Sequence, residues 1–142
     1  MVAQGNLADA LTSYRAGLVI RKRLAASDAD NAEWQRDLSV SYEKIGNVLV
    51  KQGKLADALT SYRASLVIAE RLAASDVGNA EWQRDLIISY KKIADCAPAE
   101  RRANLSRALD IVRALDASGR LEPADKWMLD DLARLISESP EK

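Results

Sequence analysis

The sequence predicts an all-α protein, built as a stack of antiparallel helical hairpins (an α-solenoid) of about six helices that ends in a C-terminal capping helix. Residues 4–48 and 52–96 align at an offset of 48, and 33 of the 45 aligned pairs are identical. Within each copy, apolar residues recur at spacings of three and four, which is typical of amphipathic helices. A repeat of this length cannot cover its own apolar face, so neighbouring copies must stack.

The chain length and the repeat together predict one domain over residues 1–142. Its expected parts are a half repeat with only the second helix (1–31), a complete repeat (32–79), a shortened third repeat (80–118), and a capping helix with its tail (119–142).

The first expected helix covers residues 7–26, and residues 1–5 are interpreted as the tail of a helix that precedes it. Gly5 aligns with Gly53, the turn residue of the complete copy. The helix at 7–26 would then lack an antiparallel partner. Either the chain is a fragment of a longer array, or a second molecule fills that gap.

The helix expected at residues 32–52 has its contact positions at steps of four, four, three and four. These are Trp34, Leu38, Tyr42, Ile45 and Leu49. Asp30 or Asn31 is suited to cap its N-terminus. Gly46 would allow another helix to approach closely, and Gly53 would end the helix in a left-handed conformation.

The second copy predicts helices at 55–74 and 80–97, after which the pattern changes. Pro98 is tolerated chiefly in a first helical turn, and a further helix is expected at 99–117. A last helix is expected from Pro123 to about Ser137. Its inward-facing residues are predicted to be Trp127, Leu132, Leu135 and Ile136.

The string IGNVLVKQGKLADALTSYRASL, residues 45–66, resembles the tetratricopeptide repeat. Ile45 and Gly46 stand at the paired Leu-Gly of the first helix, and Ala58 and Tyr62 at the small and aromatic positions of the second. Ser65 replaces the customary Ala. The period of 48 exceeds the typical 34 of the family, and such long-period repeats look like those of large bacterial multi-repeat proteins.

The resemblance implies a non-catalytic scaffold that binds a peptide or helix of a partner protein on a concave face lined by the first helix of each hairpin. The residues expected to contact the partner are Arg36, Val40, Glu43, Asn47, Lys51, Arg84, Ile88, Lys91 and Asp95. Asn47 is the leading single candidate, because Asn at this place in the family often bonds a peptide backbone. Val40 and Ile88 would be exposed apolar anchors. The alternative is that these positions are ordinary solvated residues.

A second functional hypothesis is self-association through the uncovered side of the first helix. Its contact residues would be Leu7, Leu11, Tyr14 and Leu18. The two hypotheses are compatible in part, because one surface can bind a partner while another joins two copies.

The composition disfavours other classes of function. The chain has no His and one Cys, so an enzyme, a cofactor site and a metal centre are not expected. Twenty-one basic residues balance 21 acidic ones, which disfavours nucleic-acid binding. The small basic cluster at residues 21–23 is interpreted as solvated helix surface. No apolar run is long enough for a membrane span, and a cytoplasmic location is expected.

Overall fold

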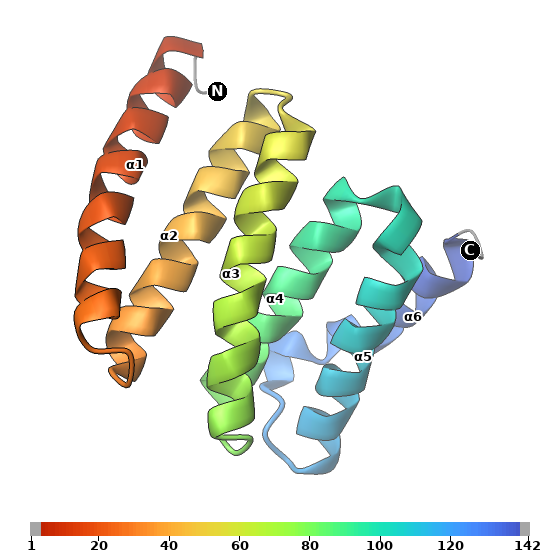
Figure 1. Cartoon of the computed structure of the whole chain (residues 1–142). Helices are drawn as coiled ribbons and strands as arrows, with labels where there is room; N and C mark the ends of the chain where they lie inside the picture. Colours follow the sequence, from red (N-terminus) through yellow and green to blue (C-terminus); the bar gives the residue numbers. More distant parts are fainter. Residues whose placement is uncertain (1–3, 140–142) are drawn as a thin grey trace. The chain divides into compact units, whose positions relative to one another are not determined.

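The computed structural model describes residues 4–139, and these residues form six α-helices and two short 3₁₀ turns without any strand (Figure 1). The elements are α1 (Gln4–Ser27), α2 (Ala32–Lys51), α3 (Leu55–Ser75), α4 (Ala80–Cys96), η1 (Pro98–Glu100), α5 (Arg101–Ala117), η2 (Pro123–Asp125) and α6 (Trp127–Glu138). The all-α prediction is confirmed, and each expected helix is present within a few residues of its expected bounds.

The chain forms two compact units, Met1–Leu72 and Ala73–Lys142, and the boundary falls in the last turn of α3. The first unit holds α1, α2 and most of α3. The second holds α4, η1, α5, η2 and α6. The expectation of one domain over 1–142 stays a prediction.

The duplicated segments adopt the same local structure where the Trp-containing helices begin. Asn31 and Asn79 are the N-caps of α2 and α4, and each side chain accepts a hydrogen bond of 3.0 Å from a backbone N–H, that of Trp34 or Trp82 respectively. In both copies a Gln side chain then reaches back 3.2 Å to a carbonyl of the preceding helix. Identical sequence therefore gives identical helix starts 48 residues apart.

Helices α2 and α3 form a tight hairpin in the first unit. A Cβ added to Gly46 would lie 2.5 Å from the Tyr62 ring, so only Gly allows this approach. The Ser61 hydroxyl donates a 2.6 Å hydrogen bond to the Tyr42 carbonyl. Gly53 adopts a φ of +79°, as predicted, and reverses the chain between the two helices.

The start of α1 differs from the expectation. Gly5 lies inside α1, whereas its counterpart Gly53 lies in a turn. The turn at Gly53 is closed by bonds to α2, from the Gly53 N–H to Val50 and from the Lys54 N–H to Leu49. Gly5 lacks the positive φ of Gly53 and lies in the first turn of α1. The part of this expectation that concerns residues 1–3 lies outside the described residues.

The predicted uncovered side of α1 is partly wrong. Helix α1 packs against α2, and Leu7 and Leu11 are buried, while Leu18 is half-buried and Tyr14 is 37% exposed. Besides Tyr14, the large apolar side chains of α1 that face solvent are Val19, Ile20 and Leu24. Self-association through all four predicted residues would therefore require Leu7 and Leu11 to leave their buried positions.

In the second unit, α4 and α5 run antiparallel and α6 packs against α5 (Figure 1). The largest fully buried side chains of this unit come from all three helices. They are Ile87, Ile93, Leu105, Val112 and Leu132. Pro98 opens the η1 turn directly before α5, the kind of position the sequence predicts for it.

The predicted inward face of α6 is wrong at Trp127, whose side chain is 55% exposed. Helix α6 begins at this residue and buries Met128 and Leu132, which lie one helical turn apart. Trp127 precedes Met128 by one position and so points about 100° away from that face. Leu132 is fully buried, as predicted, and Leu135 and Ile136 are half-buried.

Candidate functional site

Two of the predicted contact residues of α2 line a small pocket between α1 and α2, which we call the α1–α2 pocket. Its volume is about 220 Å³. The lining residues are Tyr14, Arg21, Arg36, Asp37, Val40, Ser41 and Lys44. Three cationic side chains face one carboxylate there, so the pocket carries a basic excess. Its volume suits a side chain better than a cofactor, which needs a larger site.

The other predicted contact residues of α2 lie outside this pocket. Asn47 is half-buried, and its side-chain oxygen accepts a 2.6 Å hydrogen bond from the Tyr62 hydroxyl. One of its two polar atoms thus holds α2 to α3. Glu43 is half-buried and Lys51 is exposed. Their contact with a partner stays a prediction.

Three of the four predicted contact residues of α4 are engaged by the C-terminal part of the same unit. Arg84 contacts the buried carboxylate of Asp125 in η2, with N···O distances of 2.8 and 3.1 Å. The Lys91 ammonium lies 5.3 Å from the ring centroid of Trp127, a cation–π contact.

Asp95 pairs with Arg101 of α5 at 3.5 Å, and Ile88 is 38% exposed. In the second unit, this face of the repeat therefore holds a segment that presents an acidic and an aromatic side chain. Arg84 also borders a pocket of about 280 Å³ beside η2.

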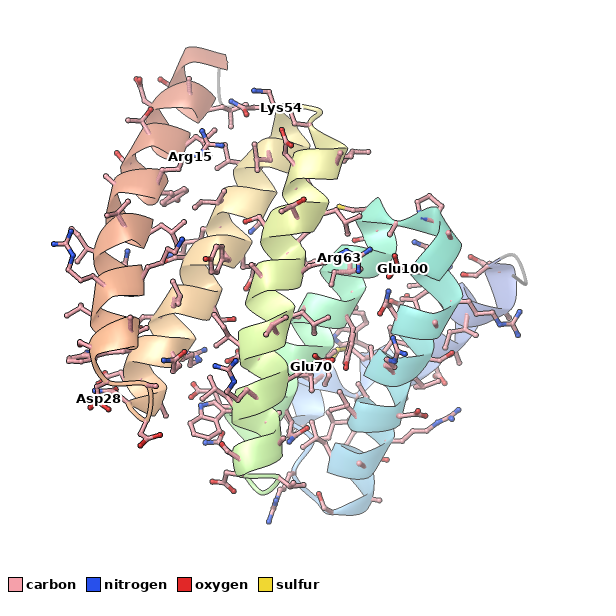
Figure 2. The ribbon with its side chains drawn as sticks, viewed as in Figure 1. Arg15, Asp28, Lys54, Arg63, Glu70 and Glu100 are labelled. Atoms are coloured by element: carbon pink, nitrogen blue, oxygen red, sulfur yellow. The ribbon has the colours of Figure 1, made fainter. Side chains whose placement is uncertain are left out.

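A groove on the other side of α2 was missed from the sequence. Its volume is about 520 Å³, and its floor is formed by Tyr42, Ile45 and Leu49. Its walls are Arg15 and Leu18 of α1 and Asp57, Thr60, Ser61 and Ala64 of α3; Figure 2 labels Arg15 on α1. The apolar spacing of α2 identified the floor as a contact face. This spacing does not indicate that α1 and α3 leave part of that face exposed.

The described residues do not offer a metal centre, since no group of three or more His, Cys, Asp or Glu side chains is placed to hold an ion. Asp28, labelled in Figure 2, accepts a hydrogen bond from the Asp30 N–H and so forms part of the turn before α2. No helix among residues 4–139 is long and apolar enough to cross a lipid bilayer.

Cys96 is the one thiol of the chain, and its surroundings disfavour nucleophilic chemistry. Burial raises the pKa of this thiol, the neighbouring Asp95 carboxylate raises the pKa further, and Lys92 opposes both effects. A raised pKa means that the thiolate fraction at neutral pH is lower than for free cysteine.

We expect iodoacetamide to alkylate Cys96 more slowly than free cysteine at pH 7, with a rate that rises as the pH approaches the raised pKa. Mass spectrometry of timed samples measures this rate. The urea-unfolded chain is the control, because unfolding removes the burial. A folded chain that reacts faster than the unfolded one at pH 7 would contradict the expected environment.

Comparison with known proteins agrees with the helical hairpin. Residues 38–76 match the family model of the tetratricopeptide repeat, and this segment covers most of α2, the Gly53 turn and all of α3. No curated protein and no solved structure matches the chain. The resemblance found in the sequence is confirmed by this match over residues 38–76.

Proposed function

We propose that this chain is a non-catalytic protein-interaction scaffold that binds an acidic segment of a partner protein at the α1–α2 pocket and the adjoining predicted contact residues of α2. Tetratricopeptide repeats generally mediate protein–protein interaction, which supports the class of function. An acidic side chain of the partner would enter the pocket near Arg21 and Lys44. An apolar side chain of the partner would cover Val40.

The observation that carries this proposal is the occupied face of α4. Arg84 and Ile88 stand at the repeat positions of Arg36 and Val40. There the carboxylate of Asp125 binds Arg84, and Trp127 lies two residues further along the same segment, over Lys91. The second unit thus provides an internal example of a segment that suits this face of the repeat.

The charges of the two faces differ in a way that should select the partner. Position 43 is Glu, whereas its counterpart in α4 is Lys91. A Trp that stacks on a cation, as Trp127 does, would find no cation at Glu43. We therefore expect the partner segment to combine an acidic residue for the pocket with an aliphatic residue for Val40.

Selection of peptides from a random display library against the full chain tests this proposal. The selected peptides should be enriched in Asp or Glu close to an aliphatic residue, and their binding should weaken as salt rises. Val40→Asp should lower their affinity at least ~10-fold, because it removes the apolar contact and repels the acidic residue.

Val67→Asp is the matched control, since Val67 lies on α3 and is 54% exposed. It should leave binding unchanged. Selected peptides without an acidic preference, or equal losses from Val40→Asp and Val67→Asp, would refute binding at the α1–α2 pocket. Circular dichroism of both variants should match that of the parent chain.

A further inference from the structure

Helices α1 and α3 carry nearly the same sequence in different surroundings. Five residues of one α3 face recur unchanged on α1, and a sixth changes from Ser65 to Gly17. On α3 these residues are Ala58, Ser61, Tyr62, Ser65, Ile68 and Leu72, and all are buried. On α1 their counterparts are Ala10, Ser13, Tyr14, Gly17, Ile20 and Leu24, and none is buried.

The exposed fractions show the size of this difference. Tyr62 is 3% exposed and Tyr14 is 37%, while Ile68 is 7% exposed and Ile20 is 59%. A position outside this face behaves differently, because Val67 and its counterpart Val19 are both more than half exposed, at 54% and 56%. The loss of burial on α1 thus affects this face, whereas Val19 keeps the exposure of Val67.

The contacts of α3 identify the element that covers this face. The Tyr62 ring packs on Gly46 of α2, and the Tyr62 hydroxyl donates to Asn47. The Ser61 hydroxyl donates to the α2 backbone, and the hydroxyls of Ser65 and Ser39 lie 2.8 Å apart. The α1 face therefore suits a helix that presents a Gly followed by Asn, with a short polar residue seven positions before the Gly.

The α1 face differs from the α3 face around residue 17. Gly17 replaces Ser65, and Arg21 replaces Ala69. The Arg21 guanidinium folds over Gly17, with Nη1 2.6 Å from the place that a Cβ of residue 17 would occupy. A helix docked here would meet a guanidinium where Ser39 meets a hydroxyl. A carboxylate at the Ser39 position would complement this charge.

We propose that this face of α1 docks a partner helix that resembles the side of α2 that packs against α3. The partner helix carries a Gly-Asn pair at the positions equivalent to Gly46 and Asn47, and an acidic residue at the position equivalent to Ser39. This interaction goes beyond the proposed function. Tyr14 and Arg21 also line the α1–α2 pocket, but Val40 of α2 serves only the proposed function. An intact second copy of the chain would not present such a helix, since its own α3 already covers that side of α2.

The probe for this interaction is a synthetic peptide with the sequence of residues 32–52 that carries Ser39→Asp and Val48→Lys. Position 48 lies almost opposite Gly46 around the helix, so the second change improves solubility without altering the contact face. Calorimetric titration of the peptide into the full chain should give saturable binding with a ratio of one to one. A peptide that also carries Gly46→Leu should bind at least ~10-fold more weakly, because its side chain would meet the Tyr14 ring.

Variants of the chain complete the test. Ser13→Arg should abolish binding, because Ser13 corresponds to Ser61, whose hydroxyl lies 2.6 Å from the α2 backbone. Val19→Arg introduces the same side chain on the solvent-exposed side of α1 and should leave binding intact. Both residues are exposed, so both variants should fold like the parent chain.

Three results would overturn the proposal. The first is a lack of binding by the parent peptide, and the second is equal binding by the Gly46→Leu peptide or by the Ser13→Arg chain. The third is a concentration-dependent dimer of the chain, seen by light scattering and removed by Ser13→Arg, which would make a second copy the occupant. Val40→Asp should leave peptide binding intact, so failure of this proposal is distinguishable from failure of the proposed function.

Discussion

Replacing Tyr62 by Ala should lower the free energy of unfolding by about 3–5 kcal/mol, whereas Tyr14→Ala should lower it by less than about 1 kcal/mol. The two tyrosines occupy the same repeat position, but Tyr62 is 3% exposed and Tyr14 is 37% exposed. Truncation at residue 62 leaves a cavity against Gly46 and removes the hydrogen bond to Asn47. Urea titration followed by circular dichroism measures both losses.

The variant Tyr62→Phe separates the contribution of the ring from that of the hydrogen bond to Asn47. It retains the ring but leaves the Asn47 side-chain oxygen without the hydroxyl, so we expect a loss of about 1 kcal/mol. Equal losses for Tyr62→Ala and Tyr14→Ala would mean that the two copies bury their tyrosines alike. That result would contradict the packing of α1 and α3 described above.

The helices could be predicted from the sequence because their signals are local. Asn31 and Asn79 cap their helices through their own side chains, and Gly53 needs only a left-handed backbone. Such features depend on a few neighbouring residues, so each copy reproduces them.

The surroundings of each helix could not be predicted, because identical residues have different neighbours. Leu7 is buried, but its counterpart Leu55 is 49% exposed. Tyr42 is one of the predicted contact positions of α2, yet it is half-buried and forms part of the floor of a groove. We therefore expect Tyr42→Ala to lower the free energy of unfolding by less than Tyr62→Ala, and by less than the roughly 3 kcal/mol that truncation of a fully buried Tyr would cost.

The candidate site was only partly accessible from the sequence for the same reason. The spacing of α2 placed Arg36 and Val40 on one face, but Tyr14 and Arg21 reach the pocket from α1. Likewise, nothing in the repeat pattern indicated that Asp125 would bind Arg84, since 41 residues separate them. Contacts between elements that are distant in sequence depend on the packing of whole helices.

Replacing Gly46 by Ala should destabilise the chain by about 1–3 kcal/mol, although Ala normally favours a helix over Gly by about 1 kcal/mol. The new Cβ would lie 2.5 Å from Cε1 and 2.7 Å from Cδ1 of the Tyr62 ring. Tyr62 is buried and hydrogen-bonded, so its ring cannot move aside without a loss of contacts. Urea titration of the variant gives the change in the free energy of unfolding.

The matched control, Gly17→Ala, should raise the free energy of unfolding instead of lowering it. A Cβ on residue 17 would meet only the Arg21 guanidinium, the free end of a flexible side chain on the helix surface. Once this guanidinium moves, the helix propensity of Ala should stabilise the chain by about 0.5–1 kcal/mol. The same substitution is therefore expected to destabilise the chain at residue 46 and to stabilise it at residue 17, because different side chains face the two Gly residues.

A double-mutant cycle shows whether the Tyr62 ring is the cause. In a Tyr62→Ala background the ring is absent, so Gly46→Ala should become neutral or stabilising. The loss of stability in the double variant should then differ from the sum of the two single losses by at least about 1 kcal/mol. If Gly46→Ala is equally destabilising in both backgrounds, the close approach of the Tyr62 ring does not explain why residue 46 must be Gly.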